Sequence, residues 1–243
     1  MSIKILKDHT TLSREVAREI LSVVNQKQNA VLCLAAGDTP KLAYNLLNEM
    51  ARSEKVDFSK CTFIGLDEWI GIPPDNEGSC FYFLQKNLFG PMEISGTQTH
   101  LFDALTNDLV SECVKMDEII HKHGPIDFML VGVGMNGHIG FNEPGTSPDL
   151  YSHVIDLDET TRSVGQKYFR QTAQLQKGIT LGFRHLMESE TVIMMASGSK
   201  KAEIIRKALE GPVTPEVPAS IVRKHKRPSI MLDQDAADLL TIV

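Results

Sequence analysis

The sequence predicts a single-domain α/β fold, with a doubly wound, mostly parallel, Rossmann-like sheet and helices on both of its faces. Three observations lead to this prediction. Segments typical of strands alternate with segments typical of helices along the 243 residues. Most of the strand segments are continuous apolar runs, as expected of strands that are buried on both faces. The residues suited to binding or catalysis come directly after strands, where ligands bind in sheets of this kind.

The first predicted units are an amphipathic helix over Thr11–Val24 and a buried strand over Ala30–Leu34. The strand leads into the turn Gly37–Pro40, and a second helix is expected over Lys41–Ala51. A glycine in the turn and a proline at the start of the helix favour an anion-binding helix N-terminus. A simple start of a helix explains the same residues, so this turn alone does not decide between the two.

The next strand, Thr62–Leu66, is followed at once by two carboxylates, Asp67 and Glu68. Because side chains alternate along an extended chain, only one of the pair is expected to point into a crevice. An acidic pair that caps the following turn is the alternative reading. A short helix over Ser79–Leu88 comes next.

The most informative stretch is Val131–Gly145, which follows a helix over Asp108–His123 and a buried strand over Phe128–Val131. Its glycines allow the backbone to turn sharply and to approach a ligand closely. It also carries an imidazole, His138, and a carboxylate, Glu143, which form a candidate acid/base pair. Glycines after a strand are often only a turn, so the other stretches must decide.

The last third of the chain begins with a polar stretch over 151–177, which reads as a lid or as a surface excursion. Three strand-like segments follow, namely Gly178–Phe183, Thr191–Ala196 and Ser229–Asp233. The turn Gly198–Lys201 lies between the last two and opens a helix to about Leu209. Lysines early in a helix oppose its dipole, so this second turn also favours an anion.

Composition limits the classes of function. The net charge of −6 argues against a non-specific nucleic-acid or anionic membrane surface. No apolar run approaches the roughly 18 residues of a membrane span, and the N-terminal M-S-I-K does not open a signal peptide. The four cysteines lie far apart without a C-x-x-C motif, so neither a metal site nor a disulfide framework is expected. We expect a cytoplasmic protein with reduced thiols.

Six motifs run through the chain in order: L-A-A-G-D-T-P at 34–40, L-D-E-W at 66–69, G-V-G-M-N-G-H-I-G-F-N-E-P-G at 132–145, G-I-T-L-G at 178–182, S-G-S-K-K-A at 197–202 and P-A-S-I-V at 218–222. Together they resemble the glucosamine-6-phosphate deaminase/isomerase family, including its galactosamine-6-phosphate branch. The segment G-H-I-G-F-N-E-P is the most specific of them. The L-D-E-W motif leans towards the galactosamine branch.

The resemblance implies a reaction without cofactor or metal. The sugar ring opens, a proton moves from C2 to C1, and the resulting imine is hydrolysed to a ketose 6-phosphate and ammonia. By resemblance, Asp67 is the enolisation base and His138 the acid/base for ring opening, with Glu143 orienting its imidazole. Asn136 stands where an aspartate is usual. Since an amide is no base, a proton relay would run through His138 and Glu143.

The resemblance also implies how the substrate is bound. The backbone N–H of Gly137 would contact the sugar, and Glu68 would support the site. Lys167 replaces a usual arginine and loses its bidentate geometry, whereas Asp38 would repel a phosphate unless it points away. The residues implied around the phosphate are Gly37, Asp38, Thr39, Lys167 and Lys201. A lid over about 151–177 would close on the intermediate.

Two rival functions share these features. A 6-phosphogluconolactonase has the fold and a G-H loop but is expected to lack the N-E-P sequence. A sugar-phosphate-sensing domain of a transcription regulator needs the phosphate contacts but not the bases. Retention of Asp67, His138 and Glu143 therefore favours an enzyme. The sequence leaves glucosamine and galactosamine 6-phosphate as alternative substrates.

We expect a monomer or small homo-oligomer that an N-acetylated sugar phosphate does not activate. By resemblance, the allosteric members carry a basic pair shortly after N-E-P and an extended C-terminus. Here the region reads Tyr151-Ser152-His153, and the sequence stops at Val243.

Overall fold

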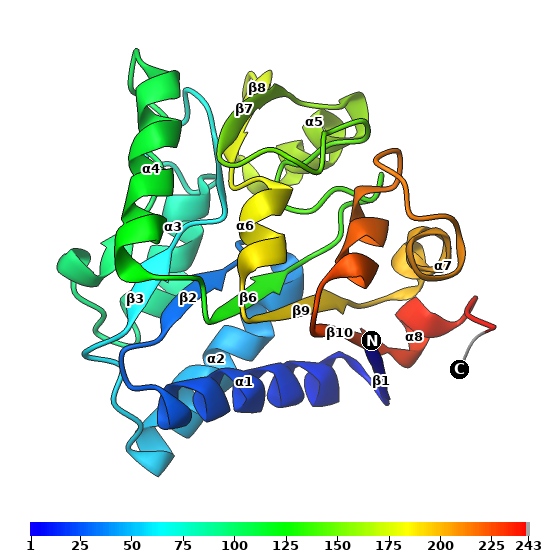
Figure 1. Cartoon of the computed structure of the whole chain (residues 1–243), viewed down its shortest axis with the longest axis horizontal. Coiled ribbons are helices and arrows are strands. Elements are labelled where there is room, and N and C mark those ends of the chain that lie inside the picture. Colours follow the sequence, from blue (N-terminus) through cyan, green and yellow to red (C-terminus); the bar gives the residue numbers. More distant parts are fainter. Residues whose placement is uncertain (242–243) are drawn as a thin grey trace.

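A seven-stranded parallel sheet forms the centre of the computed structural model, which describes residues 1–241 (Figure 1). The strand order is β1-β10-β9-β6-β2-β3-β5, and every neighbouring pair is parallel. The strands are β1 (Ser2–Leu6), β2 (Val31–Leu34), β3 (Thr62–Ile64), β5 (Thr99–His100), β6 (Phe128–Val131), β9 (Thr191–Ala196) and β10 (Pro228–Asp233). The predicted parallel α/β sheet is confirmed.

Helices cover both faces of this sheet, so the doubly wound prediction is also confirmed. Figure 1 shows α1 and α2 below the sheet, with α4, α6 and α7 above it. The helices are α1 (His9–Gln26), α2 (Asp38–Glu54), α3 (Cys80–Leu84), α4 (Leu109–His123), α5 (Glu159–Gly165), α6 (Phe183–Glu188), α7 (Ala202–Glu210) and α8 (Gln234–Ala237). Within the described residues, none of these helices combines the length and apolar character that crossing a bilayer requires.

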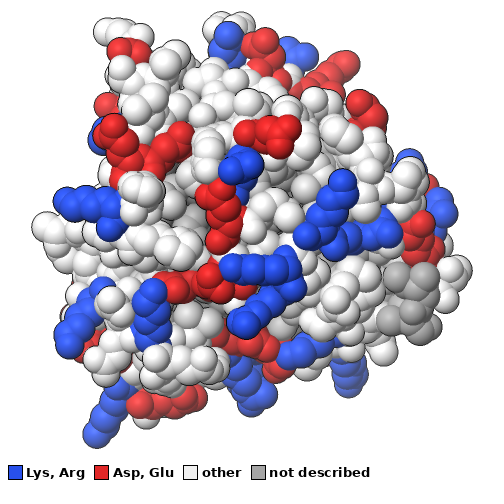
Figure 2. Space-filling model, viewed as in Figure 1, with Lys and Arg blue, Asp and Glu red and all other residues white. Residues whose placement is uncertain are grey.

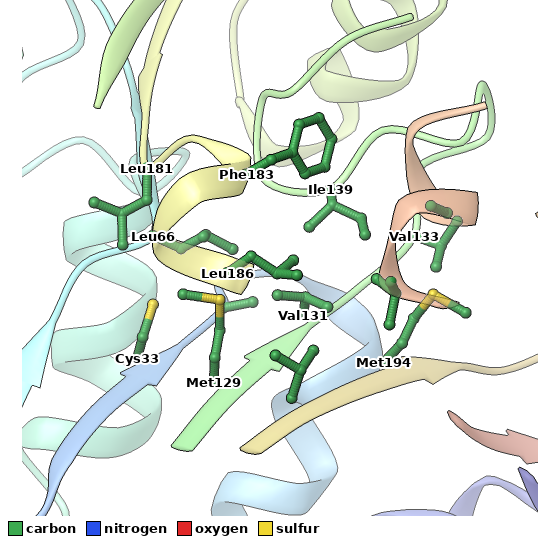
Figure 3. Packing of buried hydrophobic residues seen from close by; sticks show 14 of the residues in the cluster. Cys33, Leu66, Met129, Val131, Val133, Ile139, Leu181, Phe183, Leu186 and Met194 are labelled. Atoms are coloured by element: carbon green, nitrogen blue, oxygen red, sulfur yellow. The ribbon is translucent and has the colours of Figure 1, made fainter. Parts of the chain in front are cut away.

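Alternation along the strands divides the core into two layers. On β6, Met129 and Val131 pack towards α4, α6 and α7, whereas Phe128 and Leu130 pack towards α1 and α2. Figure 3 shows Met129 and Val131 beside Leu186 of α6. Both layers are needed because a parallel strand must be covered on each side. The continuous apolar runs of the sequence follow from this.

The central position of Phe128 leads to a stability prediction. Its side chain is fully buried between the sheet and the lower helices. Phe128→Ala leaves a cavity that the packed core refills poorly, so the free energy of unfolding should fall by about 3–5 kcal/mol. Urea denaturation measures this change. The control Val114→Ala, on the exposed face of α4, should stay within about 0.5 kcal/mol of the wild type.

A second, antiparallel sheet of three strands was not predicted. It has the order β4-β8-β7, with β4 at Asp67–Trp69, β8 at Lys177–Thr180 and β7 at His153–Asp156. The chain leaves the main sheet after β3 and starts β4 at once, so the predicted strand Thr62–Leu66 is too long. The predicted polar stretch contains β7 and α5, which lie with β8 at the top of Figure 1.

The two edge strands of the main sheet were missed as well. β1 pairs only with β10, and its residues are exposed or half-buried. β5 has two half-buried residues. Strands covered on one side only lack the continuous apolar run that reveals a central strand.

Candidate active site

A cavity of about 200 Å³ lies beyond the carboxyl ends of β2, β6 and β9. The chain winds from β2 outward to β3 and β5, and from β6 in the other direction to β9 and β10. Ligands of open α/β sheets bind at such a switch point. The predicted site residues that line the cavity are Gly37, Asp38, Thr39, Asp67, His138, Lys167 and Lys201.

Asp67 begins β4 and reaches the cavity although its neighbours are buried. The residue is half-buried, and its exposed part faces the cavity. Burial and, second, the negative charge of Glu68 raise the pKa of Asp67 to about 7. A carboxyl with this pKa accepts and releases a proton near neutral pH.

Glu68 points away from the cavity, as alternation along a strand requires. It is buried, and its carboxylate accepts hydrogen bonds from the backbone N–H groups of Trp69, Cys80 and Phe81 at 2.8–2.9 Å. Glu68 thus joins β4 to the start of α3. Glu68, which the resemblance implies as a support of the substrate site, does not itself line the cavity.

His138 and Glu143 form a couple, and His138 lines the cavity. His138 Nδ1 lies 3.3 Å from Glu143 Oε2 and 2.9 Å from Thr161 Oγ1. Burial alone would raise the pKa of Glu143, but hydrogen bonds from His138, Thr161 and Asn136 hold it below its ordinary value. An ionised Glu143 can only accept, so it favours a proton on Nδ1 and leaves Nε2 as the basic nitrogen.

Asn136 supports this couple from behind and does not line the cavity. Its side-chain amide donates to Glu143 Oε2 at 2.8 Å, and its oxygen accepts from the backbone N–H of His138 at 3.2 Å. Asn136 and the carboxylate therefore orient the imidazole together. In this position an amide is a better partner for an ionised Glu143 than a second carboxylate.

Two lysines and the start of α2 make one end of the cavity positive. Lys201 Nζ donates to the carbonyl of Val133 at 2.6 Å. Burial and, second, repulsion from Lys167 lower the pKa of Lys201 to about 8. No side chain caps α2, whose N-cap is Gly37 with φ of 124°. The N–H groups at the start of a long helix attract an anion.

Lys167 pairs with Asp38 across the mouth of the cavity at 2.7 Å. Burial works to lower the pKa of Lys167, but the hydrogen bonds and charge interactions with Asp38 and Tyr168 together outweigh burial and raise the pKa. The side chains are 51% and 65% exposed, so the pair contributes only about 0–1 kcal/mol. An arriving anion can therefore release Lys167 from Asp38 at little cost.

The segment after Lys167 is held against the first half of the chain. The Phe169 ring packs on Gly78, where an added Cβ would come within 2.3 Å of the ring. Arg170 pairs with Glu77 at 2.7 Å. These contacts bring Tyr168 and Lys167 over the cavity.

Gly137, which the resemblance implies as a contact of the sugar, does not line the cavity. Its N–H donates to Gly134 O at 3.1 Å and its carbonyl accepts from Ala219, so both backbone groups are engaged within the protein. It faces Ile204 and Val217 behind the loop.

The predicted anion turn at Gly198 is only partly correct. The Gly198 N–H donates to the Asp233 carboxylate, which Ser197 also contacts. Of this turn, only Lys201 lines the cavity.

Comparison with known proteins identifies the family. The model of the family described as glucosamine-6-phosphate isomerases/6-phosphogluconolactonase matches residues 8–231. The chain belongs to this family. The resemblance seen in the six motifs is thereby confirmed.

Relatives within the family agree with this. A glucosamine-6-phosphate deaminase of Thermoanaerobacter sp. (strain X514) is 36% identical over 241 residues, which cover 99% of this chain and 95% of the relative. That of Lachnoclostridium phytofermentans is 41% identical over 218 residues, or 89% of this chain and 92% of the relative.

Solved structures of the family match closely. A monomeric glucosamine-6-phosphate deaminase has a TM-score of 0.95 at 32% identity, and the match covers 99% of this chain and 100% of the other. The 6-phosphogluconolactonase of Thermotoga maritima has a TM-score of 0.76 at 23% identity, with 96% and 98% covered. The second likeness concerns the fold alone.

Several residues of the site carry no sequence signal within the family motifs. Thr161, Tyr168 and Cys80 all line the cavity. Thr161 reaches His138 from α5, 23 positions along the chain. Such a contact depends on how α5 packs, which no spacing in the sequence reveals.

Proposed function

We propose that this protein is an amino-sugar phosphate deaminase that converts glucosamine 6-phosphate to the ketose 6-phosphate and ammonia. The observation that carries the proposal is the cavity shared by Asp67, His138 and two lysines. It combines two proton-transfer groups with a positive end for a phosphate. The names of the relatives described above support glucosamine over galactosamine 6-phosphate.

His138 serves ring opening in this mechanism. With the proton on Nδ1, beside Thr161 and Glu143, Nε2 exchanges a proton between the anomeric hydroxyl and the ring oxygen, so the C1–O5 bond breaks and the aldehyde forms. Glu143 stabilises the imidazolium that arises transiently. Asn136 and Thr161 keep both groups in place.

Asp67 then moves the carbon-bound proton. Its carboxylate removes the proton from C2 while O1 gains a proton, which gives an enolamine. The carboxylic acid then returns the C2 proton to C1, and the amino group gives up one proton to become the imine at C2, so no proton is gained or lost overall. Water adds to the imine and ammonia departs. A pKa near 7 suits this shuttle, because the same group must be base and acid in turn.

The phosphate occupies the positive end, beside Gly37, Thr39 and the two lysines. Lys201, which is held in place by the carbonyl of Val133, supplies a positive charge. Lys167 leaves its ion pair with Asp38 and pairs with the phosphate instead. The segment over about 151–177, which carries Lys167 and Tyr168, acts as the lid that limits water during enolisation. Opening would break the contacts of Phe169 and Arg170.

We further infer a cytoplasmic enzyme that works as a monomer or small homo-oligomer, without activation by an N-acetylated sugar phosphate. Acidic and basic side chains are interspersed over the face in Figure 2, so that face presents no large field of one sign to a nucleic acid. Light scattering and a hyperbolic rate curve, unchanged by N-acetylglucosamine 6-phosphate, would support this. A sigmoidal curve that this compound abolishes would contradict it.

Parallel ammonia-release assays on glucosamine 6-phosphate and galactosamine 6-phosphate test the proposed function. We expect ammonia and ketose 6-phosphate in equal amounts, with a higher kcat/KM for the glucosamine sugar. Hydrolysis of 6-phosphogluconolactone without release of ammonia would support the rival lactonase. Sugar-phosphate binding without turnover would support the sensor.

The packing of His138 on Gly134 gives a first kinetic prediction. A Cβ at position 134 would lie 2.4 Å from His138 Nε2. Gly134→Ala should therefore displace the imidazole and lower kcat by about 10–100-fold, because small misplacements of a reacting group cost this much. In the control Gly96→Ala, the added Cβ meets nothing within 4 Å, and kcat should be unchanged. Equal kcat in both variants would contradict the assigned role of His138.

A second kinetic prediction concerns pH. The ratio kcat/KM reports the ionisations of the free enzyme. Below about pH 7 Asp67 is protonated and cannot act as base, and above about pH 8 Lys201 loses the charge that attracts the phosphate. We expect a narrow, bell-shaped profile of kcat/KM against pH, with its acid limb near pH 7 and its alkaline limb near pH 8. Lys201→Met should remove the alkaline limb, and a limb that persists in this variant would contradict the assignment.

A further inference from the structure

The hydroxyl of Thr161 is a close polar partner of the His138 ring. Thr161 is buried in the first turn of α5 and lines the cavity. Its Oγ1 lies 2.9 Å from His138 Nδ1, whereas Glu143 Oε2 lies 3.3 Å from the same nitrogen. Hydrogen bonds from N–H to oxygen usually span about 2.7–3.2 Å. Thr161 therefore makes the closer contact with Nδ1, and Glu143 the longer one.

The charge of Glu143 decides which of the two groups donates this hydrogen bond. If the Thr161 hydroxyl donated to Nδ1, the lone pair of Nδ1 would face the carboxylate of Glu143 at 3.3 Å, which is repulsive. The side-chain amide of Asn136 also donates to Thr161 Oγ1, at 3.4 Å, which fits an oxygen that accepts. The proton of the contact is therefore on Nδ1 of His138, and Thr161 accepts it.

The hydroxyl proton of Thr161 is then available to Glu143. Oγ1 accepts from His138 and Asn136, so its own proton needs an acceptor. Glu143 Oε2 shares both neighbours, at 3.3 Å from His138 Nδ1 and 2.8 Å from Asn136 Nδ2. Burial favours the neutral form of Glu143, but a hydrogen bond from Thr161 is among the contacts that keep its pKa below the ordinary value. Thr161 thus bridges the imidazole and the carboxylate.

The start of α5 is tied to the same groups. Asp158 is the N-cap of α5, and its side chain accepts from the amide of Asn136 at 3.2 Å. The backbone N–H of Asp158 donates to Glu143 Oε1 at 3.4 Å. α5 lies in the segment that we propose as the lid. Docking of α5 therefore brings Thr161 to His138.

We propose that Thr161 is a positioning residue that accepts the Nδ1 proton of His138, bridges to Glu143, and fixes the reactive tautomer only while α5 is docked. This inference rests on the proposed role of His138 in ring opening. When α5 moves away, Nδ1 is left with the longer contact to Glu143, so the tautomer with the proton on Nε2 gains population. Ring opening then waits for the lid, and the aldehyde forms in a covered site.

Two substitutions of Thr161 should separate the hydroxyl from the shape of the side chain. Thr161→Val keeps the shape but removes the hydroxyl, so kcat should fall about 3–10-fold, as for one lost hydrogen bond, with little change in KM. Thr161→Ser keeps the hydroxyl and should stay within about twofold of the wild type. The control is Ser163→Ala, an exposed position on α5, where kcat should be unchanged. A loss in Thr161→Val that serine does not rescue would contradict the proposal.

Nitrogen-15 NMR of labelled histidines reads the tautomer without turnover, with His138→Gln for assignment. The wild type and Thr161→Ser should carry the proton on Nδ1, and Thr161→Val should show a mixture of both tautomers. Asp158→Ala, which loses the cap of α5, should shift the tautomer in the same direction.

The spectra separate this proposal from the proposed function. An unchanged tautomer in Thr161→Val would overturn the bridging role of Thr161. A tautomer that changes in Thr161→Val but not in Asp158→Ala would overturn the dependence on docked α5. Should the wild type release no ammonia, the proposed function fails, and the same spectra still decide whether Thr161 holds the Nδ1 proton.

Discussion

Asp67→Asn is expected to lower kcat by about 10²–10⁴-fold, the contribution usual for a well-placed proton-transfer group. The amide keeps the shape of the side chain but cannot take the proton from C2. Because Asp67 faces the cavity without an ion pair, KM should change little. Ammonia release under saturating glucosamine 6-phosphate measures the effect. Turnover near the wild-type rate would show that another group is the base.

The same variant should be more stable than the wild type above pH 7. The pKa of about 7 in the folded protein lies above the ordinary 3.8, so Asp67 contributes stability that is present below pH 3.8 and lost as the pH rises through 7. Asparagine cannot ionise and avoids this loss. Since the cavity gives the carboxyl some access to water, we expect a gain of about 1–2 kcal/mol at pH 8. Thermal unfolding at pH 5 and pH 8 should show a gain that grows with pH.

Glu143→Gln should have the second large effect, a fall in kcat of about 10²–10³-fold, smaller than the loss of about 10⁴ in a triad whose carboxylate becomes an amide. Glu143 Oε2 accepts from Asn136 at 2.8 Å and lies 3.3 Å from His138 Nδ1. A glutamine has one acceptor oxygen and adds N–H donors, so it can favour the other tautomer of His138. The proton would then sit on Nε2, where the mechanism requires a base.

The matched control is Glu203→Gln, on the exposed side of α7, where the carboxylate pairs with the side chains of Arg206 and Lys207 in water. Its kcat should equal that of the wild type. Both proteins should keep the far-UV circular dichroism of the wild type. If Glu143→Gln retained full activity, orientation of the imidazole by Glu143 would not contribute to catalysis.

The main sheet could be predicted because its central strands are recognisable in the sequence as continuous apolar runs. Val31–Leu34, Phe128–Val131 and Thr191–Ala196 are covered on both faces, so they consist almost entirely of apolar residues. The small sheet could not be predicted in this way. β7 has half-buried residues and pairs with β8 through backbone groups that every sequence possesses.

The candidate site was predictable where a residue follows a central strand. Asp67, His138 and Lys201 come after β3, β6 and β9, and all three reach one cavity. Contacts made by loops were not predictable. Gly137 has its backbone groups paired within its own loop and with Ala219, and Thr161 contacts His138 only because α5 folds over the loop.

The fate of the C2 hydrogen tests the central claim that Asp67 acts on the sugar phosphate bound beside His138. Glucosamine 6-phosphate labelled with deuterium at C2 is converted in ordinary water, and NMR follows the label in substrate and product. We predict that the wild type transfers part of the deuterium to C1 of the ketose 6-phosphate and loses the rest to water, and that Asp67→Asn does neither. Label moving from C2 at the wild-type rate in Asp67→Asn would contradict the account.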